Sequence, residues 1–233
     1  MNKQMLITNY FKSDSIDNNK DNQLNIKNPL LNNKKIDKYF NQPKQILKND
    51  NKPLEKKETK IIDKIDIFTD GSTINNGKKN ASGGFGVYFP DTRFHNISTK
   101  YTKEDVSNQK CELLAILKGL EYVFYYFKEK SKMVNVVVYT DSKYSIDCFT
   151  KYIKNWKSNG WKLRNNQQVK NRNLIEKIDY YIQQFNHIRF HHIYSHKHEP
   201  YNKNSLEYYL WYGNDMADKL ANEGRLKQIF NNK

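Results

Sequence analysis

The chain has few cysteines and no long apolar segment. Its 233 residues include only two cysteines, Cys111 and Cys148. Both lie in segments whose apolar residues recur with helical spacing. Such positions argue against a disulfide framework and fit a reducing compartment. No apolar run approaches the roughly 18 residues that a membrane-spanning helix needs, and the N-terminal segment lacks a signal-peptide core. We therefore expect a soluble, intracellular protein with no membrane partner.

Acidic residues are scarce relative to basic ones. The chain has 40 Lys and Arg against 25 Asp and Glu, which gives a net charge of +15 at pH 7. A surplus of this size indicates a polyanionic partner, because basic side chains that bind nucleic acid release its counterions. The alternative is that the abundance of Lys and Asn reflects an A/T-rich genome, which would account for part of the same charge.

Two regions differ in pattern. Residues 1–60 are rich in Asn, Lys and Asp without a sustained period of 2 or 3.6, so we expect a disordered tail. A folded domain is expected over residues 61–230. Its apolar periodicity predicts strands at 61–68, 83–89, 93–99, 133–140 and 188–194, and helices at 113–127, 142–153, 169–185 and 214–229. This order predicts an α/β domain, a mixed five-stranded sheet with three antiparallel strands followed by parallel ones, flanked by helices.

Four acidic residues stand where metal ligands are expected. Asp70 and Asp141 each end an apolar strand, and Glu112 and Asp215 lie near the starts of predicted helices. If the two strands are neighbours, their carboxylates lie side by side. Converging carboxylates repel one another unless cations lie between them, and hard oxygen ligands favour Mg²⁺ or Mn²⁺. Two such ions about 4 Å apart promote in-line displacement at phosphodiesters.

These acidic residues belong to a series of motifs in a fixed order. The motifs are Thr69-Asp70-Gly71-Ser72, Asn108-Gln109-Lys110-Cys111-Glu112-Leu113, Tyr139-Thr140-Asp141-Ser142, Trp156-Lys157-Ser158-Asn159-Gly160-Trp161, Val169-Lys170-Asn171-Arg172, Tyr194-Ser195-His196 and Gly213-Asn214-Asp215-Met216-Ala217-Asp218. From about residue 63 to 226 the chain resembles ribonuclease H of type 1, the cellular enzymes with a handle region. The resemblance implies the ribonuclease H-like fold. It also implies an endonuclease that hydrolyses the RNA strand of RNA–DNA hybrids, leaving 5′-phosphate and 3′-hydroxyl ends.

The resemblance also implies catalytic roles. Asp70, Glu112, Asp141 and Asp215 would hold two Mg²⁺ ions, with Mn²⁺ as a substitute. Glu112 would also contact the sugar beside the cleaved phosphate. His196 would assist the release of metal and product; the alternative is that it is one surface histidine among several.

Substrate contacts follow from the same resemblance. Amides at Asn76, Asn108 and Gln109 would bind the RNA 2′-hydroxyls, although Asn76 also suits a plain turn. The DNA strand would be bound by Ser107, Tyr144, Tyr152, Trp156 and Asn171, with Lys157 and Lys162 on the handle. The alternative for Trp156 and Trp161 is that they pack the handle onto the body. Asp105 departs from the family, which often has Arg in this part of its phosphate pocket.

The segment between His196 and Asp215 is longer than usual in the family. It contains several aromatic residues, namely Tyr201, Tyr208, Tyr209, Trp211 and Tyr212. Two interpretations remain open. These residues cap the active site, or they form a small additional core.

The tail contains a candidate partner-binding motif. Gln4, Ile7, Tyr10 and Phe11 follow the spacing of peptides that bind the sliding clamp PCNA, and residues 33–40 contain a degenerate copy. The alternative is a chance match in a sticky tail. Clamp tethering would raise the local enzyme concentration at replicating DNA. It indicates a role in RNA primer or R-loop removal, in the nucleus or a viral replication compartment.

We expect a monomer. Non-catalytic hybrid binding and cleavage of DNA junctions are the competing functions.

Overall fold

The structure is a computed structural model that describes residues 60–195 and 197–227. The clamp-binding motif of Gln4, Ile7, Tyr10 and Phe11 and the candidate catalytic His196 lie outside the described residues. So does nearly all of the tail predicted to be disordered, and the domain boundaries at residues 60 and 230 stay predictions. No helix in the described ranges combines the length and the apolar character that crossing a membrane requires.

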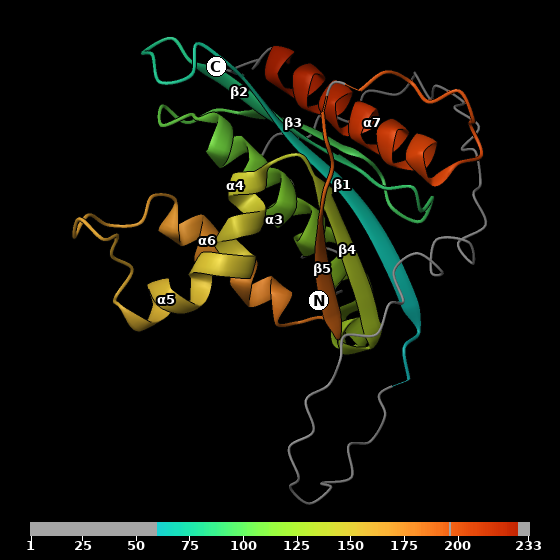
Figure 1. The fold of residues 1–233 in the computed structure, drawn as a ribbon, viewed down its shortest axis with the longest axis horizontal. Helices are drawn as coiled ribbons and strands as arrows, with labels where there is room; N and C mark the ends of the chain where they lie inside the picture. Colours follow the sequence, from blue (N-terminus) through green and yellow to red (C-terminus); the bar gives the residue numbers. More distant parts are fainter. Residues whose placement is uncertain (1–59, 196, 228–233) are drawn as a thin grey trace, which may run out of the picture.

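The sheet has the predicted mixed topology. Its five strands are β1 (Asp63–Ile74), β2 (Ser82–Tyr88), β3 (Ile97–Tyr101), β4 (Val134–Thr140) and β5 (His187–His192), in the spatial order β3-β2-β1-β4-β5 (Figure 1). β1, β2 and β3 pair antiparallel, whereas β4 pairs parallel with both β1 and β5. The predicted fold class is therefore confirmed.

Two strand boundaries differ from the prediction. β1 continues past Phe68 to Ile74, because its polar second half pairs with β2 in the register Asp70↔Gly86 to Ile74↔Ser82. Asp70 is therefore inside the strand rather than at its end. β3 begins at Ile97 rather than at residue 93, since the residues before it form a turn in which the Asn96 Oδ1 accepts a hydrogen bond from the Phe89 N–H.

Helices cover both faces of the sheet. The helices are α3 (Asn108–Phe127), α4 (Lys143–Asp147), α5 (Ile153–Ser158), α6 (Arg172–Ile182) and α7 (Leu206–Leu226), with a 3₁₀ turn at Lys128–Met133 and a π-helical turn at Cys148–Tyr152. α7 lies across one face, and the other helices lie on the opposite side (Figure 1). Successive side chains of β1 point to opposite faces of the sheet, so the strand contributes to the cores on both faces. Ile65 and Ile67 belong to the large core with α3, and Phe68 belongs to a second core under α7.

Helix α7 begins two turns earlier than the sequence pattern predicts. Ser205 caps it, its Oγ accepting a hydrogen bond from the Tyr208 N–H at 3.0 Å. Tyr209 and Tyr212 pack into the core beneath α7, where the Tyr209 hydroxyl donates to Asp66 Oδ2 at 2.7 Å. For these aromatics the structure favours the additional core, whereas Tyr201 is fully exposed.

Small residues let α7 approach the sheet closely. A Cβ on Gly86 of β2 would lie 2.4 Å from the Ala217 carbonyl oxygen and 2.5 Å from the Ala221 nitrogen. Real Cβ atoms do not come so near to backbone atoms, so any side chain at this position would push the helix away. The contact fixes the height of α7 above β2, and therefore the position of its acidic residues.

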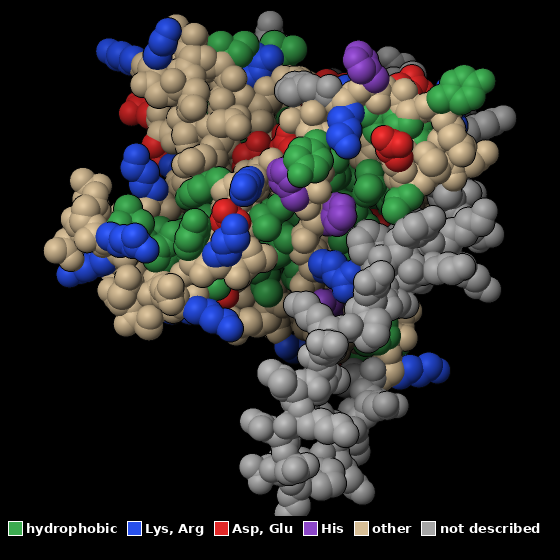
Figure 2. Space-filling model, viewed as in Figure 1, with side chains coloured by type: hydrophobic (Ala, Val, Ile, Leu, Met, Phe, Trp, Pro, Cys, Tyr) green, Lys and Arg blue, Asp and Glu red, His purple; other side chains and the backbone are tan. Residues whose placement is uncertain are grey.

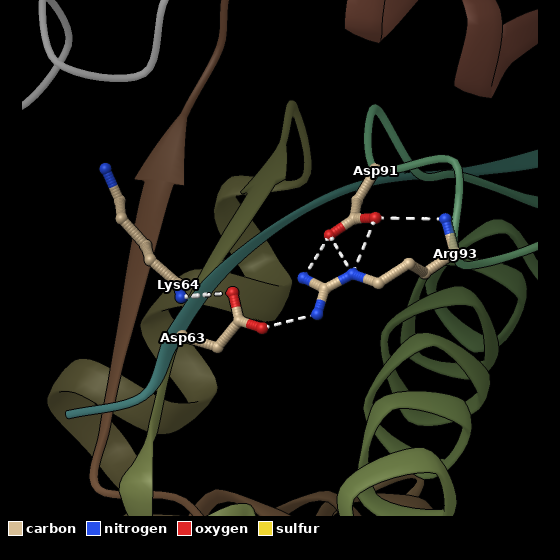
Figure 3. A network of polar contacts seen from close by, with 4 residues as sticks. All are labelled: Asp63, Lys64, Asp91 and Arg93. Carbon is tan, nitrogen blue, oxygen red and sulfur yellow. Dashed lines mark hydrogen bonds and ion pairs between the residues drawn. The ribbon is translucent and has the colours of Figure 1, made fainter.

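A polar network secures the other end of β1. Arg93, in the β2–β3 connection, donates to Asp63 Oδ2 at 2.5 Å and to both carboxylate oxygens of Asp91 (Figure 3). The Asp63 Oδ1 accepts from the Lys64 N–H at 2.9 Å. The Arg93 guanidinium also lies 5.9 Å from the ring centroid of Tyr126 on α3. These partly exposed contacts join the β2–β3 connection to β1 and α3 at the strand's N-terminal end.

Candidate active site

Three carboxylates, from β1, α3 and the residue after β4, meet where the two parallel strands run toward the same end of the sheet. Oxygen atoms of Asp70, Glu112 and Asp141 lie within 4.8 Å of one another. The parallel register Phe68↔Tyr139 explains the first pair, because Asp70 and Asp141 each follow the paired residue by two positions. The strands therefore deliver two carboxylates to the same end of the sheet, as the sequence predicts.

Glu112 reaches this pair because α3 lies very close to β1. A Cβ on Gly71 would lie 2.5 Å from the Glu112 nitrogen and 2.8 Å from the Cys111 carbonyl carbon. Only glycine leaves room there for the first turn of α3, which Ser107 caps by accepting from the Lys110 N–H at 3.3 Å. The glycine after Asp70 is therefore part of the site's construction.

The buried carboxylates are held in an unfavourable environment. Asp70 is 8% exposed and Glu112 is 4% exposed. Burial, and then the charge of Asp141, raise the pKa of Asp70 well above its usual value. Burial, and then the charges of Asp70 and Asp141, raise the pKa of Glu112 in the same way. A metal-free site therefore favours protonated carboxyls at pH values where an exposed carboxylate is fully charged.

This donor set fits a divalent cation. The Glu112 Oε1 accepts from the Asn108 Nδ2 at 3.4 Å, whereas Oε2 is buried without a hydrogen-bond partner among the described residues. An unsatisfied carboxylate oxygen beside two further carboxylates is costly unless a cation neutralises it. Oxygen-only ligands of this kind suit Mg²⁺ or Mn²⁺.

Asp215 does not join this cluster. Its Oδ2 pairs with the Lys219 Nζ at 2.6 Å along α7. Asp218 lies closer to the cluster, since its carboxyl group is within hydrogen-bonding distance of the Asp70 carboxyl and contributes to the raised pKa of Asp70. Of the four carboxylates predicted to converge, the structure thus brings three within 4.8 Å of one another, and Asp218 rather than Asp215 lies beside Asp70.

Helical geometry explains the difference. Small residues on α7 mark the side that packs on the sheet, namely Gly213, Ala217, Ala221 and Gly224. At roughly 100° per residue, Asp218 lies about 105° from the centre of this stripe and Asp215 about 165° from it. Asp215 therefore points further away from the sheet, and so from Asp70 on β1. The small-residue stripe was the signal in the sequence that distinguishes the two.

The carboxylates open into a cavity of about 700 Å³. Its wall includes both Asp215 and Asp218, with His191, His192, Tyr194, Lys197 and Trp211 on the side formed by β5, the following segment and α7. The His192 Nε2 lies 3.1 Å from the Asp141 carbonyl oxygen, so this ring supports the backbone that carries Asp141. The cavity is large enough for a sugar-phosphate unit beside the carboxylates.

Comparison with known proteins identifies the family. A sequence model of RNase H matches residues 63–225. The chain belongs to the ribonuclease H family. The ribonuclease H of Ruthia magnifica subsp. Calyptogena magnifica is 34% identical over 163 residues, which cover 69% of this chain and 94% of that protein. The ribonuclease H of Schizosaccharomyces pombe is 31% identical over 193 residues, 82% of this chain and 64% of that protein. The predicted family and ribonuclease H activity are confirmed.

Solved structures support the fold. The solution structure of the PFV RNase H domain superposes with a TM-score of 0.51 at 24% identity, covering 69% of this chain and 93% of that domain. The foamy viral protease-reverse transcriptase solved with an RNA/DNA hybrid superposes with a TM-score of 0.52 at 21% identity, covering 80% of this chain and 22% of that one. Both likenesses concern the ribonuclease H-like architecture.

The amides predicted to contact RNA lie beside the carboxylates. The Asn108 N–H donates to the Asn76 Oδ1 at 3.3 Å, and the Asn108 Oδ1 accepts from the Thr73 hydroxyl at 3.2 Å. Asn108 therefore connects the β1–β2 turn to Glu112. Asn76 and Gln109 are exposed, and of the three amides only Asn108 lines the cavity.

The residues predicted to contact DNA form a second group, around α4 to α6. Tyr144 and Asn171 are hydrogen-bonded through their side chains. The rings of Tyr152 and Trp156 lie 5.4 Å apart, and Tyr152 is 44% exposed. Ser107 is committed to capping α3. Figure 2 shows several Lys and Arg side chains over α5 and α6, on the same side of the molecule.

Two handle residues also have structural roles. Trp161 is 6% exposed and lies under the Arg172 guanidinium, 5.2 Å from its ring centroid, which supports the packing alternative for this tryptophan. Lys157 pairs with Asp179 of α6, so it fastens the handle to the body, whereas Lys162 is exposed. Asp105 pairs with Lys110 and accepts from the Tyr101 hydroxyl at 2.5 Å. Its charge, unusual in a phosphate-binding region, is thereby partly offset.

Proposed function

We propose that this ribonuclease H hydrolyses the RNA strand of RNA–DNA hybrids with two divalent cations, Mg²⁺ or Mn²⁺. Asp70, Glu112 and Asp141 hold them, with Asp218 as the fourth carboxylate. The observation that carries the proposal is the cluster of three carboxylates within 4.8 Å, two of them buried, in which one Glu112 oxygen has no partner among the described residues.

The chain itself positions the groups that take part in the reaction. When bound, the cations would lower the pKa of the attacking water and stabilise charge on the departing 3′ oxygen, which yields 5′-phosphate and 3′-hydroxyl ends. Asn108 orients Glu112 by donating to its Oε1. His192 supports the backbone at Asp141. The rigid strands β1 and β4 keep the two aspartates in place without reorganisation during the reaction.

Recognition of both strands explains the choice of a hybrid. Amide side chains at Asn76, Asn108 and Gln109 both donate and accept hydrogen bonds, which suits them to the 2′-hydroxyl groups that only RNA carries. The aromatic and polar residues of the handle side, Tyr144, Tyr152, Trp156 and Asn171 with Lys162, would contact the DNA strand. A duplex of DNA alone lacks the hydroxyls, and a duplex of RNA alone offers the wrong second strand.

Cleavage of labelled duplexes tests this proposal. With Mg²⁺, the full chain is expected to cut the RNA strand of an RNA–DNA hybrid and to leave duplex RNA and duplex DNA intact. Chelation by EDTA is expected to stop the reaction, and end analysis to find 5′-phosphates. Tight hybrid binding with no cleavage would instead support a non-catalytic adaptor, and cutting of branched DNA would support a junction nuclease.

We also propose that the motif Gln4, Ile7, Tyr10 and Phe11 binds a PCNA-type sliding clamp. What supports it is the sequence spacing, since a single helical turn would put Ile7, Tyr10 and Phe11 on one side. The double variant Tyr10→Ala/Phe11→Ala of the full chain is expected to lose clamp binding in a calorimetric titration and to keep hybrid cleavage. Unchanged affinity would remove the tether from the proposal, and substitution of Tyr39 and Phe40 tests the second copy separately.

Such a tether would assign the enzyme to RNA primer or R-loop removal during DNA replication. The nucleus or a viral replication compartment is the corresponding location. We propose a monomer as the active unit.

A further inference from the structure

The cavity beside the carboxylates has a marked imbalance of charge. Its acidic lining consists of Asp70, Glu112, Asp141, Glu207, Asp215 and Asp218. Among the described residues that line it, Lys197 is the only Lys or Arg. A polyanionic substrate that enters such a cavity is repelled by the carboxylates that cations do not neutralise. A fixed positive charge on the wall would offset part of that repulsion where the phosphate backbone enters.

Lys197 is held in place from two directions. Its carbonyl oxygen accepts a hydrogen bond from the Trp211 Nε1–H of α7 at 3.0 Å. Its ammonium nitrogen lies 5.3 Å from the ring centroid of Tyr194, which is itself 68% exposed at the cavity wall. The backbone contact and the cation–π contact restrict a side chain that would otherwise be free, so binding an anion there costs less conformational entropy.

The ammonium group also has no carboxylate partner among the described residues. Other lysines on this surface are paired, as Lys219 is with Asp215 and Lys203 with Glu199. The structure places no such ion pair on Lys197, although six acidic side chains line the same cavity. Its hydrogen-bond donors therefore remain available to a ligand that enters the cavity.

We propose that Lys197 binds a backbone phosphate of the nucleic-acid substrate beside the carboxylate cluster, and that Trp211 is the positioning residue that holds it there. The inference deepens the proposed function and rests on it. This role would explain why α7 extends toward its N-terminus. Because α7 begins at Leu206, Trp211 lies against the segment after β5. Lys197 thus adds a contact that is separate from the handle on the α4–α6 side.

Steady-state cleavage kinetics of Lys197→Gln test the proposal, with Lys203→Gln as the matched control. The Lys203→Gln substitution removes the same charge from the same segment. Lys203, however, pairs with Glu199 and does not line the cavity. Lys197→Gln is expected to raise KM for the hybrid about tenfold with little change in kcat. The slope of log KM against log salt concentration is expected to fall by about 0.7–0.9, as for the loss of one phosphate contact.

Trp211→Phe tests the positioning role, because it keeps an aromatic ring and removes only the N–H donor. It is expected to raise KM about threefold in the same salt-dependent way, through a looser Lys197. In the double variant with Lys197→Gln, Trp211→Phe is expected to add nothing. Lys197→Arg, which keeps the charge, is expected to remain within about twofold of wild type.

The outcomes separate this inference from the proposed function. If the wild type cuts hybrids, and Lys197→Gln and Lys203→Gln have equal KM values and equal salt slopes, Lys197 is not a phosphate ligand and the nuclease proposal stands. If the wild type does not cut, the nuclease proposal fails. Fluorescence anisotropy with the same labelled hybrid then compares the two glutamine variants, and equal affinities overturn the role of Lys197 as well.

Discussion

Asp70→Asn is expected to abolish hybrid cleavage, with kcat/KM at least ~10³-fold below wild type. The side chain comes from the central strand and has an oxygen within 4.8 Å of both other carboxylates, so its loss removes one of the three carboxylates that would hold the cations. A loss of about 4 kcal/mol of transition-state stabilisation corresponds to this factor. The measurement is single-turnover cleavage of the labelled hybrid in saturating Mg²⁺, and a variant that cuts at the wild-type rate would exclude Asp70 from the site.

The same substitution is expected to stabilise the metal-free protein. Burial and the neighbouring carboxylates raise the pKa of Asp70 in the folded state, whereas the unfolded chain keeps a value of about 3.9. Below that pH both states are protonated and wild type and variant are alike. As the pH rises through the folded pKa, the wild type loses stability and the neutral Asn does not. The gain at neutral pH is expected to be about 1–3 kcal/mol.

Thermal unfolding in EDTA across a pH series measures this gain. Glu129→Gln is the control, because Glu129 is an exposed carboxylate in the 3₁₀ turn after α3. A benefit of Asp70→Asn that does not depend on pH would contradict the electrostatic explanation. Added Mg²⁺ is expected to reverse the order of stability, since the wild type alone retains the complete carboxylate cluster for the cation.

The layout of the fold could be predicted because apolar periodicity survives in nearly every element. The apolar run at 133–140 is typical of a buried strand and the alternation at 188–194 of a strand with one covered face, and both are present as β4 and β5. The second half of β1 could not be predicted in this way. Gly71, Ser72 and Thr73 are polar or small, and only pairing with β2 keeps them extended. Tertiary pairing, rather than local propensity, decides that segment.

The start of α7 could not be predicted from the sequence for a related reason. Tyr208 to Tyr212 have no polar face that alternates with the aromatic one, so the segment suggested a loop. The cap at Ser205 and the core formed with Phe68 and Tyr139 make it helical. Once the helix begins at Leu206, Trp211 acquires a fixed position beside Lys197. Trp211 and Lys197 therefore form one side of the cavity, which the sequence motifs alone do not predict.

The carboxylate positions on β1, α3 and β4 were predictable because Asp70 ends the apolar half of β1, Asp141 directly follows β4, and Glu112 lies in the first turns of the capped helix α3. The position on α7 was not, because the motif contains two aspartates and only the packing of the helix distinguishes them. Gly86 and Gly84 bring α7 down onto β2, and the sheet-facing stripe turns Asp218 toward Asp70. A three-residue difference in sequence thus separates an aspartate that lies beside Asp70 from one that pairs with Lys219, although both line the cavity.

Asp218→Asn and Asp215→Asn are therefore expected to differ sharply. Asp218 lies within hydrogen-bonding distance of Asp70, whereas Asp215 pairs with Lys219. Asp218→Asn is expected to lower kcat/KM about 10²-fold, close to 3 kcal/mol, and to raise the Mg²⁺ concentration needed for half-maximal rate. Asp215→Asn is expected to stay within about threefold, because an exposed i,i+4 ion pair contributes little.

The two variants are controls for each other, since each exchanges one aspartate for asparagine on the same helix. Both keep the helix cap and the small-residue stripe, so neither is expected to shift α7 against β2. Magnesium titrations of hybrid cleavage, run on both variants with the wild type, give the comparison. The opposite order, with Asp215→Asn inactive and Asp218→Asn near wild type, would mean that cation binding rotates or shifts α7 to bring Asp215 to the cluster. That movement would require the close contact between Gly86 and Ala217 to change, which a Gly86→Ala variant would expose as a further loss of activity.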